Sequence, residues 1–333
     1  MRKYVLFFLW QNLLFAAYAA IPPGYYSPID GKQAAALKFA LCQLLQDHLV
    51  LEYDNLWFAF AVTDTRPDGT AWDMYSDTRR MGFWGMNREH AFPKSWWGGV
   101  VNAAYSDLHH IFPADEAANL AKSNYPLGIV GIPVFNNGVS KVGYDSFQES
   151  STENVVFEPA DAYKGDFARA YFYVVTCYQE LEWKHTFMVE TSAYPTLKPE
   201  AIRLLMDWHL KDPVSDKERN RNDAVFECQR NRNPFVDYPE LASYLWGDST
   251  AYAFNLKGRE GQSATKQLLQ VYATKGTLSV IALKPGLLID FYNSLGMKRL
   301  SVISTVVWQQ IENLSAGIYL VTCLGKTQKV RVK

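Results

Sequence analysis

The stretch Asn87–Pro126 reads NREHAFPKSWWGGVVNAAYSDLHHIFPADEAANLAKSNYP. It begins with the adjacent pair Glu89 and His90 in a segment that predicts irregular β structure, and continues through a loop rich in Trp and Gly. A helix is predicted to open near Pro113–Asp115, where Asp115 would cap it and Asn119 would lie about one turn in. The stretch therefore predicts strand, loop and helix close together, with several catalytically capable side chains among them.

These residue types suit the hydrolysis of a phosphodiester bond. The attacking water must lose a proton, and histidine has a pKa near 7 without any perturbation. Negative charge grows on the phosphoryl oxygens, and a hard divalent cation neutralises it. Magnesium prefers oxygen ligands, so the Glu89 carboxylate and the Asn119 amide oxygen suit it and leave His90 free as a base. Because neighbours on an extended chain point to opposite faces, the backbone must bend here, or the metal and the water must lie on either side of the strand.

Three motifs together are more specific than any of these residues alone. The stretches NREHAFP, SDLHHIFPA and NLAKSNYP resemble the bacterial endonuclease I family, with an Asn twelve residues past the Asp and a Ser-Asn pair soon after. Later segments of the chain are similar to that family as well, and the whole resemblance spans about Pro22 to Gly247. These segments are Asn87–Pro93, Ser106–Ala114, Asn119–Pro126, Glu158–Ala168 and Asp212–Pro239.

The resemblance implies an α+β fold whose core is a ββα-metal (His-Me finger) unit surrounded by helices. It implies that Glu89 and Asn119 are the metal ligands and that His90 is the general base. The implied cofactor is Mg²⁺, and Mn²⁺ or Ca²⁺ would also suit oxygen ligands. The implied activity is cleavage of DNA, and often RNA, with little sequence preference and with 5′-phosphate ends. Asp107, His109 and His110 are expected to support the site structurally.

The chain departs from the family pattern at the group that holds the cleaved phosphate. Family members commonly place an arginine between the His and Asn motifs, but no arginine lies between His90 and Asn119 here. Lys94 and Lys122 are therefore the catalytic candidates for that role, with Arg88 also nearby. Arg88 and Asn124 are predicted to contact nucleic acid.

Two Arg-Asn-Arg-Asn stretches, Arg219–Asn222 and Arg230–Asn233, offer further contacts. Acidic residues are interleaved with them, so a solvated helix face is one interpretation. The family resemblance favours the other interpretation, in which Arg219, Arg221, Arg230 and Arg232 contact phosphates. Trp96 and Trp97 are either base-stacking platforms or packing residues of their loop.

The overall charge gives no field that would attract a polyanion. The 333 residues carry 33 basic and 34 acidic side chains, a formal net charge of −1. Any nucleic-acid surface must then be local, or a bound cation must supply the charge. The four cysteines do not form a disulfide scaffold, so buried thiols are one interpretation and a bridge is the other.

The first residues have the pattern of a signal peptide. A basic start precedes an apolar run, and Ala17-Tyr18-Ala19 offers a cleavage site, which places the signal at residues 1–19. A membrane anchor is the alternative, although the run is short for a span. We expect export through the periplasm to the medium or the cell surface, no stable membrane insertion, and a soluble monomer.

The chain past Gly247 changes character. Residues 20–247 form the expected catalytic domain, 248–268 a small polar linker, and 269–333 a series of short strands typical of a β-sandwich. Val271–Lys333 resembles the sorting domain of Gram-negative type IX secretion, whose machinery would be its partner. The alternative is an ordinary accessory sandwich, such as a carbohydrate-binding module.

Helices are predicted from apolar spacing and caps in the first domain. A short apolar stretch, Leu56–Val62, precedes a hairpin-like turn at Arg66–Gly69. The predicted helices are Asp30–Leu49 with Asp30 as its cap, Asp166–Trp183, Pro199–Leu210, and Ser215–Gln229 with a capping box of Ser215 and Glu218.

Two other functions remain open from the sequence. One is a zinc hydrolase in which His90, His109 and His110 converge on the metal beside Glu89, although no HExxH motif is present. The other is a non-enzymatic glycan-binding surface protein with aromatic platforms.

Overall fold

The computed structural model describes residues 21–146 and 154–257, followed by seven strands of the C-terminal region with their adjoining turns. These fall into two compact units that divide after Lys257. The predicted signal peptide and residues 258–268 lie outside the described residues. The first unit extends ten residues beyond Gly247, because Phe254 is fully buried in it and accepts a hydrogen bond from the Gly31 amide at 2.7 Å. The linker prediction was therefore wrong for this part of the chain.

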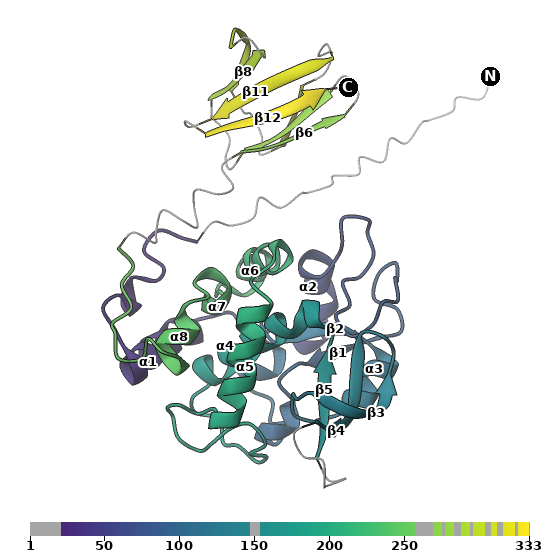
Figure 1. The fold of residues 1–333 in the computed structure, drawn as a ribbon, viewed down its shortest axis with the longest axis vertical. Helices are drawn as coiled ribbons and strands as arrows, with labels where there is room; N and C mark the ends of the chain where they lie inside the picture. The colour runs from purple at the N-terminus through teal and green to yellow at the C-terminus, as the bar shows by residue number, and fades with distance from the viewer. Residues whose placement is uncertain are drawn as a thin grey trace, which may run out of the picture. The chain divides into compact units, whose positions relative to one another are not determined.

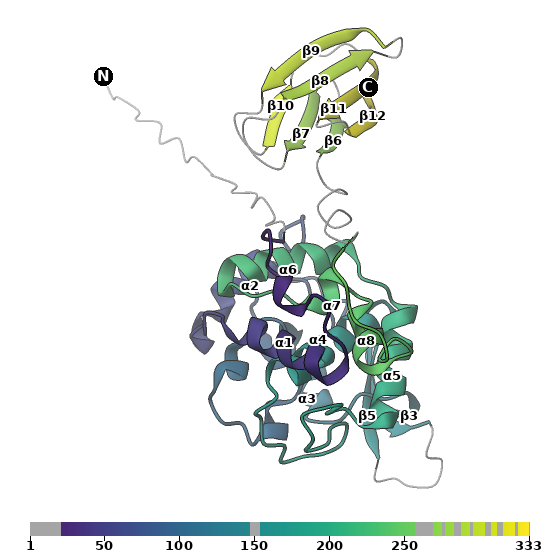
Figure 2. The same cartoon turned by 90° about the vertical axis from the view of Figure 1, so that its left-hand side faces the viewer.

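Helices account for more residues of the first unit than strands do (Figures 1 and 2). The longest buried one is α4, in which every residue except Lys164 is buried, and α1 and α5 pack against it. The helices are α1 (Ala34–Gln46), α2 (Leu56–Thr63), α3 (Glu116–Lys122), α4 (Lys164–Cys177), α5 (Pro199–Lys211), α6 (Asp216–Gln229), α7 (Pro234–Asp237) and α8 (Leu241–Trp246).

Two small antiparallel sheets complete this unit. A hairpin pairs β1 (Met86–His90) with β2 (Ile111–Asp115). A separate sheet has the order β3-β4-β5, formed by Val130–Asn136, Ser140–Asp145 and Val155–Pro159. The predicted α+β class is confirmed as a mixture of helices and sheets.

The helix predictions differ in outcome. The α5 helix begins at Pro199 as predicted, and α6 has the predicted capping box of Ser215 and Glu218. The first helix is shorter than predicted and its N-cap is Gln33. Asp30 does not cap it, because its carboxylate accepts the Leu256 amide at 2.7 Å instead.

The structure separates the two interpretations of the cysteines for the described residues. Cys42 and Cys177 are buried free thiols, and Cys228 is a partly buried free thiol. The Cys42 thiol lies 3.3 Å from the Cys177 carbonyl, in a hydrogen bond to the backbone. The buried-thiol interpretation is therefore confirmed for Cys42 and Cys177.

A buried lysine joins α1 to the segment before α5. The Lys38 ammonium donates to the Ala193 carbonyl at 2.5 Å and to the Thr196 hydroxyl at 2.6 Å. Thr196 itself has a φ of +69°, which a β-branched residue rarely adopts, so the surrounding contacts must hold it there. Burial lowers the pKa of Lys38 to about 7.

Lys38 should make the stability of the protein rise with pH. Above pH 7 the folded state releases this proton, whereas the unfolded state keeps it up to about pH 10.4. Between pH 7 and 8.5 the free energy of unfolding should therefore rise by roughly 1–2 kcal/mol from this group. Urea unfolding of Lys38→Met at several pH values should show that increment missing. The exposed Lys32→Met variant is the control, and an unchanged slope in Lys38→Met would contradict the assignment.

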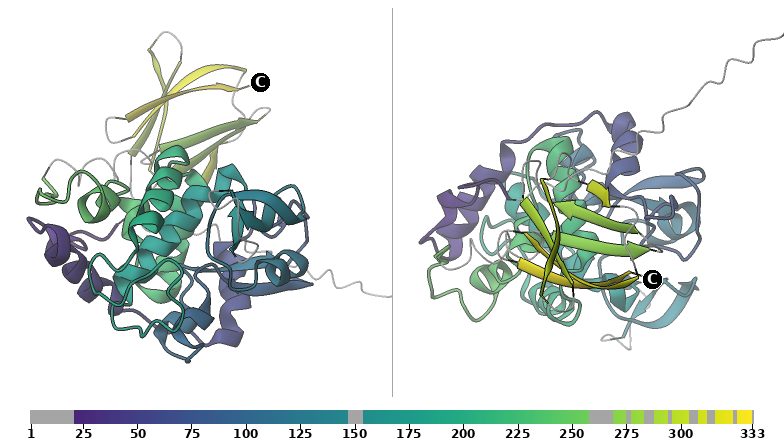
Figure 3. Two further views of the ribbon diagram at one scale, coloured as in Figure 1. Left: turned by 60° about the horizontal axis from the view of Figure 1, so that its bottom comes forward. Right: turned by 90° about the horizontal axis from the view of Figure 1, so that it is seen from above.

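The second unit consists of antiparallel strands (Figure 3). One sheet has the order β10-β7-β6 and the other β12-β11-β8-β9. The strands lie in the part of the chain predicted to hold a series of short strands. They are β6 (Leu269–Thr274), β7 (Thr277–Ala282), β8 (Leu288–Asn293), β9 (Lys298–Ile303), β10 (Trp308–Ile311), β11 (Gly317–Cys323) and β12 (Lys326–Val332). In the described part of the chain, no helix has the length and apolar character needed to cross a bilayer.

Candidate active site

The decisive stretch folds as a hairpin followed by a helix. In the hairpin His90 pairs with Ile111 and Met86 with Asp115. Asp115 then caps α3, accepting the Ala118 amide at 3.0 Å as predicted. Because α3 packs against both strands, its residues meet the end of β1.

A buried ion pair joins the helix to the strand. The Lys122 ammonium lies 2.6 Å from Glu89 Oε1 and also donates to the His90 carbonyl at 3.3 Å. Lys122 is fully buried, while the Glu89 side chain keeps 11 % of its surface exposed. Burial raises the pKa of the Glu89 carboxyl and the Lys122 charge opposes that rise. Lys122 therefore positions and neutralises Glu89, and its charge is committed to that contact.

Asn119 lies on the same face of α3 as Lys122. The two are three residues apart on the helix, so their side chains are neighbours, and Lys122 reaches Glu89. Asn119 is half-buried and its amide has no hydrogen-bond partner in the described part of the chain. A partly exposed carboxylate and an uncommitted amide oxygen on facing elements fit the ligand chemistry of Mg²⁺.

The imidazole of His90 is held in one tautomer. Its Nε2 lies 3.0 Å from the Tyr105 carbonyl oxygen. Since a carbonyl only accepts, Nε2 carries the proton and Nδ1 keeps its lone pair. Burial first, and the neighbouring His110 second, lower the pKa of His90 well below its usual value. The ring is therefore neutral near pH 7 and is available as a base.

Aromatic rings fix the orientation of that imidazole. The Tyr53 ring stacks on it at 5.8 Å between centroids, and the Tyr105 ring meets it edge-on at 5.4 Å. Lys94 donates to the Tyr105 hydroxyl at 3.0 Å and lies half-buried beside this group. Tyr53 and Tyr105 were not predicted from the sequence, because neither lies in a recognisable motif and the contact between them depends on tertiary structure.

The residues expected to support the site are buried. Asp107 accepts hydrogen bonds from the hydroxyls of Tyr173 and Tyr178, each at 2.6 Å, and from Gln229 at 2.7 Å. This places Asp107 in a network that ties the segment before β2 to α4 and α6. These hydrogen bonds occupy the Asp107 carboxylate, so it is not available to a substrate.

The histidines do not form a zinc site. His109 Nε2 contacts the Asn231 carbonyl at 3.1 Å, and His110 Nε2 contacts the Ala104 carbonyl at 2.7 Å. The predicted zinc site would also need one position that the imidazoles of His90, His109 and His110 all reach. Within residues 21–146, 154–257 and the described strands, no group of three His, Cys, Asp or Glu side chains is placed to hold a metal. The arrangement does not support the zinc hydrolase.

Two of the four predicted phosphate-binding arginines are buried. Arg221 donates to both carboxylate oxygens of Asp64, at 2.8 and 3.1 Å, and to two backbone carbonyls. Arg232 is paired with Asp223 and Asp237 at 2.5 and 2.6 Å. These guanidinium groups hold the fold together and are not available to a phosphate, so the predicted contacts for Arg221 and Arg232 do not fit the structure.

The other basic residues reach solvent. Arg219 lies in the first turn of α6 and Arg230 at its end, with roughly half of each side chain exposed. The Arg88 side chain extends from β1, and its guanidinium carbon lies 3.9 Å from the Tyr53 ring centre. Of these three arginines, Arg88 is the one that contacts a ring beside His90 in the described part of the chain.

The tryptophans singled out from the sequence are packing residues. Trp96 is fully buried and Trp97 is 2 % exposed. The Trp96 indole donates to the Asn124 backbone carbonyl at 2.9 Å, which fixes the half-buried Asn124 after α3. The loop-packing interpretation is therefore correct, and neither ring can stack on a base.

Comparison with known proteins explains this arrangement. The model of the Endonuclease I family matches residues 33–240, a range that includes every site residue described above. The chain belongs to the endonuclease I family. It is therefore a hydrolase that cleaves nucleic acid, and members of the family are generally metal-dependent.

Curated relatives carry names consistent with this endonuclease family. The chain is 32 % identical to the "Extracellular ribonuclease" of Bacillus amyloliquefaciens over 236 residues, which covers 67 % of this chain and 78 % of the relative. It is 31 % identical to the "Extracellular ribonuclease" of Bacillus subtilis (strain 168), with the same coverage. An "Extracellular deoxyribonuclease" of Aeromonas hydrophila is 25 % identical over 41 % of this chain and 51 % of its own length.

Proposed function

We propose that this protein is a secreted, metal-dependent endonuclease that cleaves DNA and RNA with little sequence preference and leaves 5′-phosphate ends. The observation that carries the proposal is the hairpin-helix unit. It brings His90, with a free Nδ1, beside Glu89 and the face of α3 that bears Asn119. The hairpin followed by a helix supports a ββα-metal core.

His90 acts as the general base in this proposal. Its Nδ1 takes the proton from the attacking water, while Nε2–H remains bonded to the Tyr105 carbonyl. That bond keeps the ring from turning and stabilises the imidazolium that forms. The stacked Tyr53 ring restricts the imidazole to one plane.

Glu89 and Asn119 would hold the metal, with Mg²⁺ the best match to two oxygen ligands. When bound, such an ion neutralises charge on the phosphoryl oxygens and on the departing 3′ oxygen. Lys122 fixes the Glu89 carboxylate toward α3. Lys94 is the best placed cation for the cleaved phosphate. It lies beside Tyr105, and no acidic side chain in the described part of the chain pairs with its ammonium.

Export and sorting form the second part of the proposal. The apolar segment of residues 1–19 would direct export through the periplasm, and three relatives are named extracellular. The separate unit of strands from Leu269 onward supports a removable C-terminal module read by the type IX secretion machinery. No described feature favours glycan binding over this role.

The test uses protein recovered from the medium of the producing bacterium. It should begin at Ala20 and should nick supercoiled plasmid and cut single-stranded RNA in Mg²⁺, and EDTA should stop both reactions. End-labelling with and without phosphatase should show 5′-phosphates on the products. Cleavage that persists in EDTA, or products with 5′-hydroxyl ends, would contradict the mechanism.

A further inference from the structure

One tryptophan that is close in sequence to the site residues is almost fully exposed to solvent. Trp84 is 91 % exposed, two residues before β1 begins. Among the tryptophans whose side chains the structure describes, it alone is exposed. Tryptophan side chains are highly buried on average, so an indole that is almost fully exposed is a candidate for contact with a partner.

The loop that carries Trp84 is anchored on both sides. The adjacent Phe83 packs its ring against α2, 6.1 Å from Trp57 and 5.9 Å from Phe60. Arg80 forms an ion pair of 2.5 Å with Asp115, the residue that caps α3. Trp84 is therefore presented on a fixed support that is tied to the helix of the active site.

Stacked groups connect this loop to the catalytic base. The Tyr53 ring stacks on the His90 imidazole. The Arg88 guanidinium carbon lies 3.9 Å from the centre of the same Tyr53 ring and 5.4 Å from the Trp57 ring. Trp57 in turn contacts Phe83. Arg88 donates to the Tyr53 carbonyl at 2.6 Å, and its acidic partner is the highly exposed Asp54, whose carboxylate a phosphate can replace.

The chain itself limits how far Trp84 lies from the base. His90 lies six positions after Trp84, and an extended strand advances about 3.3 Å per residue, so their Cα atoms lie within roughly 20 Å of each other. Stacked nucleotides are about 3.4 Å apart along a strand, so this span holds roughly six nucleotides. A nucleic acid bound at His90 can therefore reach Trp84.

We propose that Trp84 stacks on an unpaired base of the substrate within a few nucleotides of the cleaved bond, with Arg88 on the connecting backbone. The inference rests on the proposed nuclease function and adds a substrate preference to it. Paired bases in a duplex stack on each other and do not offer their faces, so this contact favours single-stranded DNA and RNA or locally opened duplex. Stacking tolerates any base, which agrees with low sequence preference.

Binding should be measured in the non-cleaving His90→Ala background in Mg²⁺. The probe is a fluorescein-labelled 12-nucleotide oligothymidylate, and its anisotropy reports binding. Adding Trp84→Ala should weaken binding roughly 5- to 150-fold, the range for losing one base stack. Trp84→Phe should retain most of the affinity, and an oligonucleotide of the same length made of abasic sites should bind all three proteins equally.

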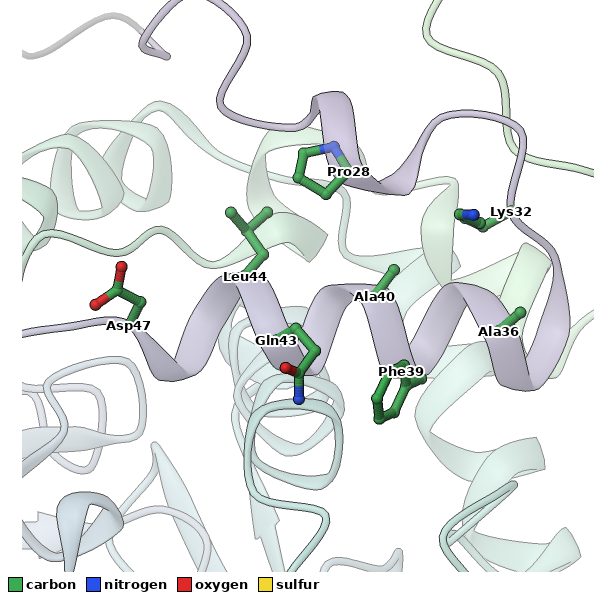
Figure 4. Close-up of a pocket in the computed structure, with 8 residues that line it drawn as sticks. All are labelled: Pro28, Lys32, Ala36, Phe39, Ala40, Gln43, Leu44 and Asp47. Carbon is green, nitrogen blue, oxygen red and sulfur yellow. The ribbon is translucent and has the colours of Figure 1, made fainter.

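Phe39→Ala is the matched control for loss of an exposed aromatic ring. Phe39 is 60 % exposed on α1, beside the shallow groove between that helix and Ser27–Ile29 (Figure 4). That helix packs against α4 and α8, which carry none of the site residues. This variant should bind the oligonucleotide as the parent does.

Several results would overturn the inference without touching the nuclease proposal. One is unchanged oligothymidylate affinity in Trp84→Ala while the wild type still cleaves. Another is an equal loss for the abasic probe, which would indicate a backbone or folding effect. A third is a change in oligomeric state with unchanged binding, which would assign Trp84 to contact between copies. Failure of the wild type to cleave any nucleic acid would instead reject the nuclease proposal itself.

Discussion

Replacing His90 by glutamine is expected to lower the rate of phosphodiester cleavage by about 10²- to 10⁴-fold, the usual contribution of a general base. Glutamine can keep the hydrogen bond to the Tyr105 carbonyl with its amide nitrogen, but it has no lone pair of suitable basicity for water. The loss should therefore appear in kcat, with substrate affinity nearly unchanged. Initial rates on a fluorescence-quenched oligonucleotide in Mg²⁺ would measure both quantities.

Two further variants make this result specific. His90→Ala removes the ring as well, so added imidazole should partly restore its activity, whereas the glutamine variant leaves no room for rescue. His185→Ala removes an exposed histidine that stacks on Phe187, outside the hairpin and α3, and should cleave at the wild-type rate. Full plasmid nicking by purified His90→Ala protein would remove the basis for the assignment.

Lys122→Met is expected to lower the free energy of unfolding by about 3–5 kcal/mol, because it leaves the Glu89 carboxylate buried without its counter-charge. Urea denaturation monitored by circular dichroism would measure the change. Glu89→Gln combined with Lys122→Met should recover part of the loss, since the double variant buries no unpaired charge. A Lys122→Met protein as stable as the wild type would show that the pair does not contribute in solution.

Two further variants, Lys122→Arg and Glu89→Gln alone, separate stability from catalysis. Lys122→Arg keeps the positive charge, so it should lose less stability than Lys122→Met. Glu89→Gln keeps the size of the side chain but removes a charged metal ligand, so it should need far more Mg²⁺ to reach half of its maximal rate. If Glu89→Gln had the wild-type Mg²⁺ dependence, Glu89 would not be a ligand.

Features set by local sequence could be predicted. The Asp115 cap and the capping box at Ser215 depend on hydrogen bonds between residues three apart. The start of α5 at Pro199 depends on the fixed φ of proline, which suits a first helical turn. Each of these is visible in a window of a few residues.

Features set by contacts between residues far apart in the sequence could not be predicted. The segment Leu56–Val62 is apolar on all sides, so its pattern does not distinguish a strand from the helix α2 that it forms. The β3-β4-β5 sheet was not predicted at all, because residues 130–159 mix glycine, proline and polar residues without a clear alternation. Asp30 has the character of a cap, but a bond to Leu256, over 200 residues away, takes its carboxylate.

The active site shows the same division. The metal-ligand and base assignments came from motifs and remain proposals, whereas the Glu89–Lys122 pair joins residues 33 positions apart and appears only in the structure. The Arg-Asn repeats look alike in sequence. Arg221 and Arg232 are buried because Asp64, Asp223 and Asp237 surround them, and composition cannot show which arginines have such partners.

The buried ammonium of Lys122 also determines how much charge a bound cation would offer to the substrate. The charges of the Glu89 carboxylate and the Lys122 ammonium cancel, and Asn119 is neutral. The two positive charges of a divalent ion at this position would therefore not be offset by its protein ligands. In a chain whose formal net charge is −1, attraction of a polyanion would then be switched on by the ion rather than built into the protein surface. Loading with Mg²⁺ would thus govern both the capture of the nucleic acid and its cleavage.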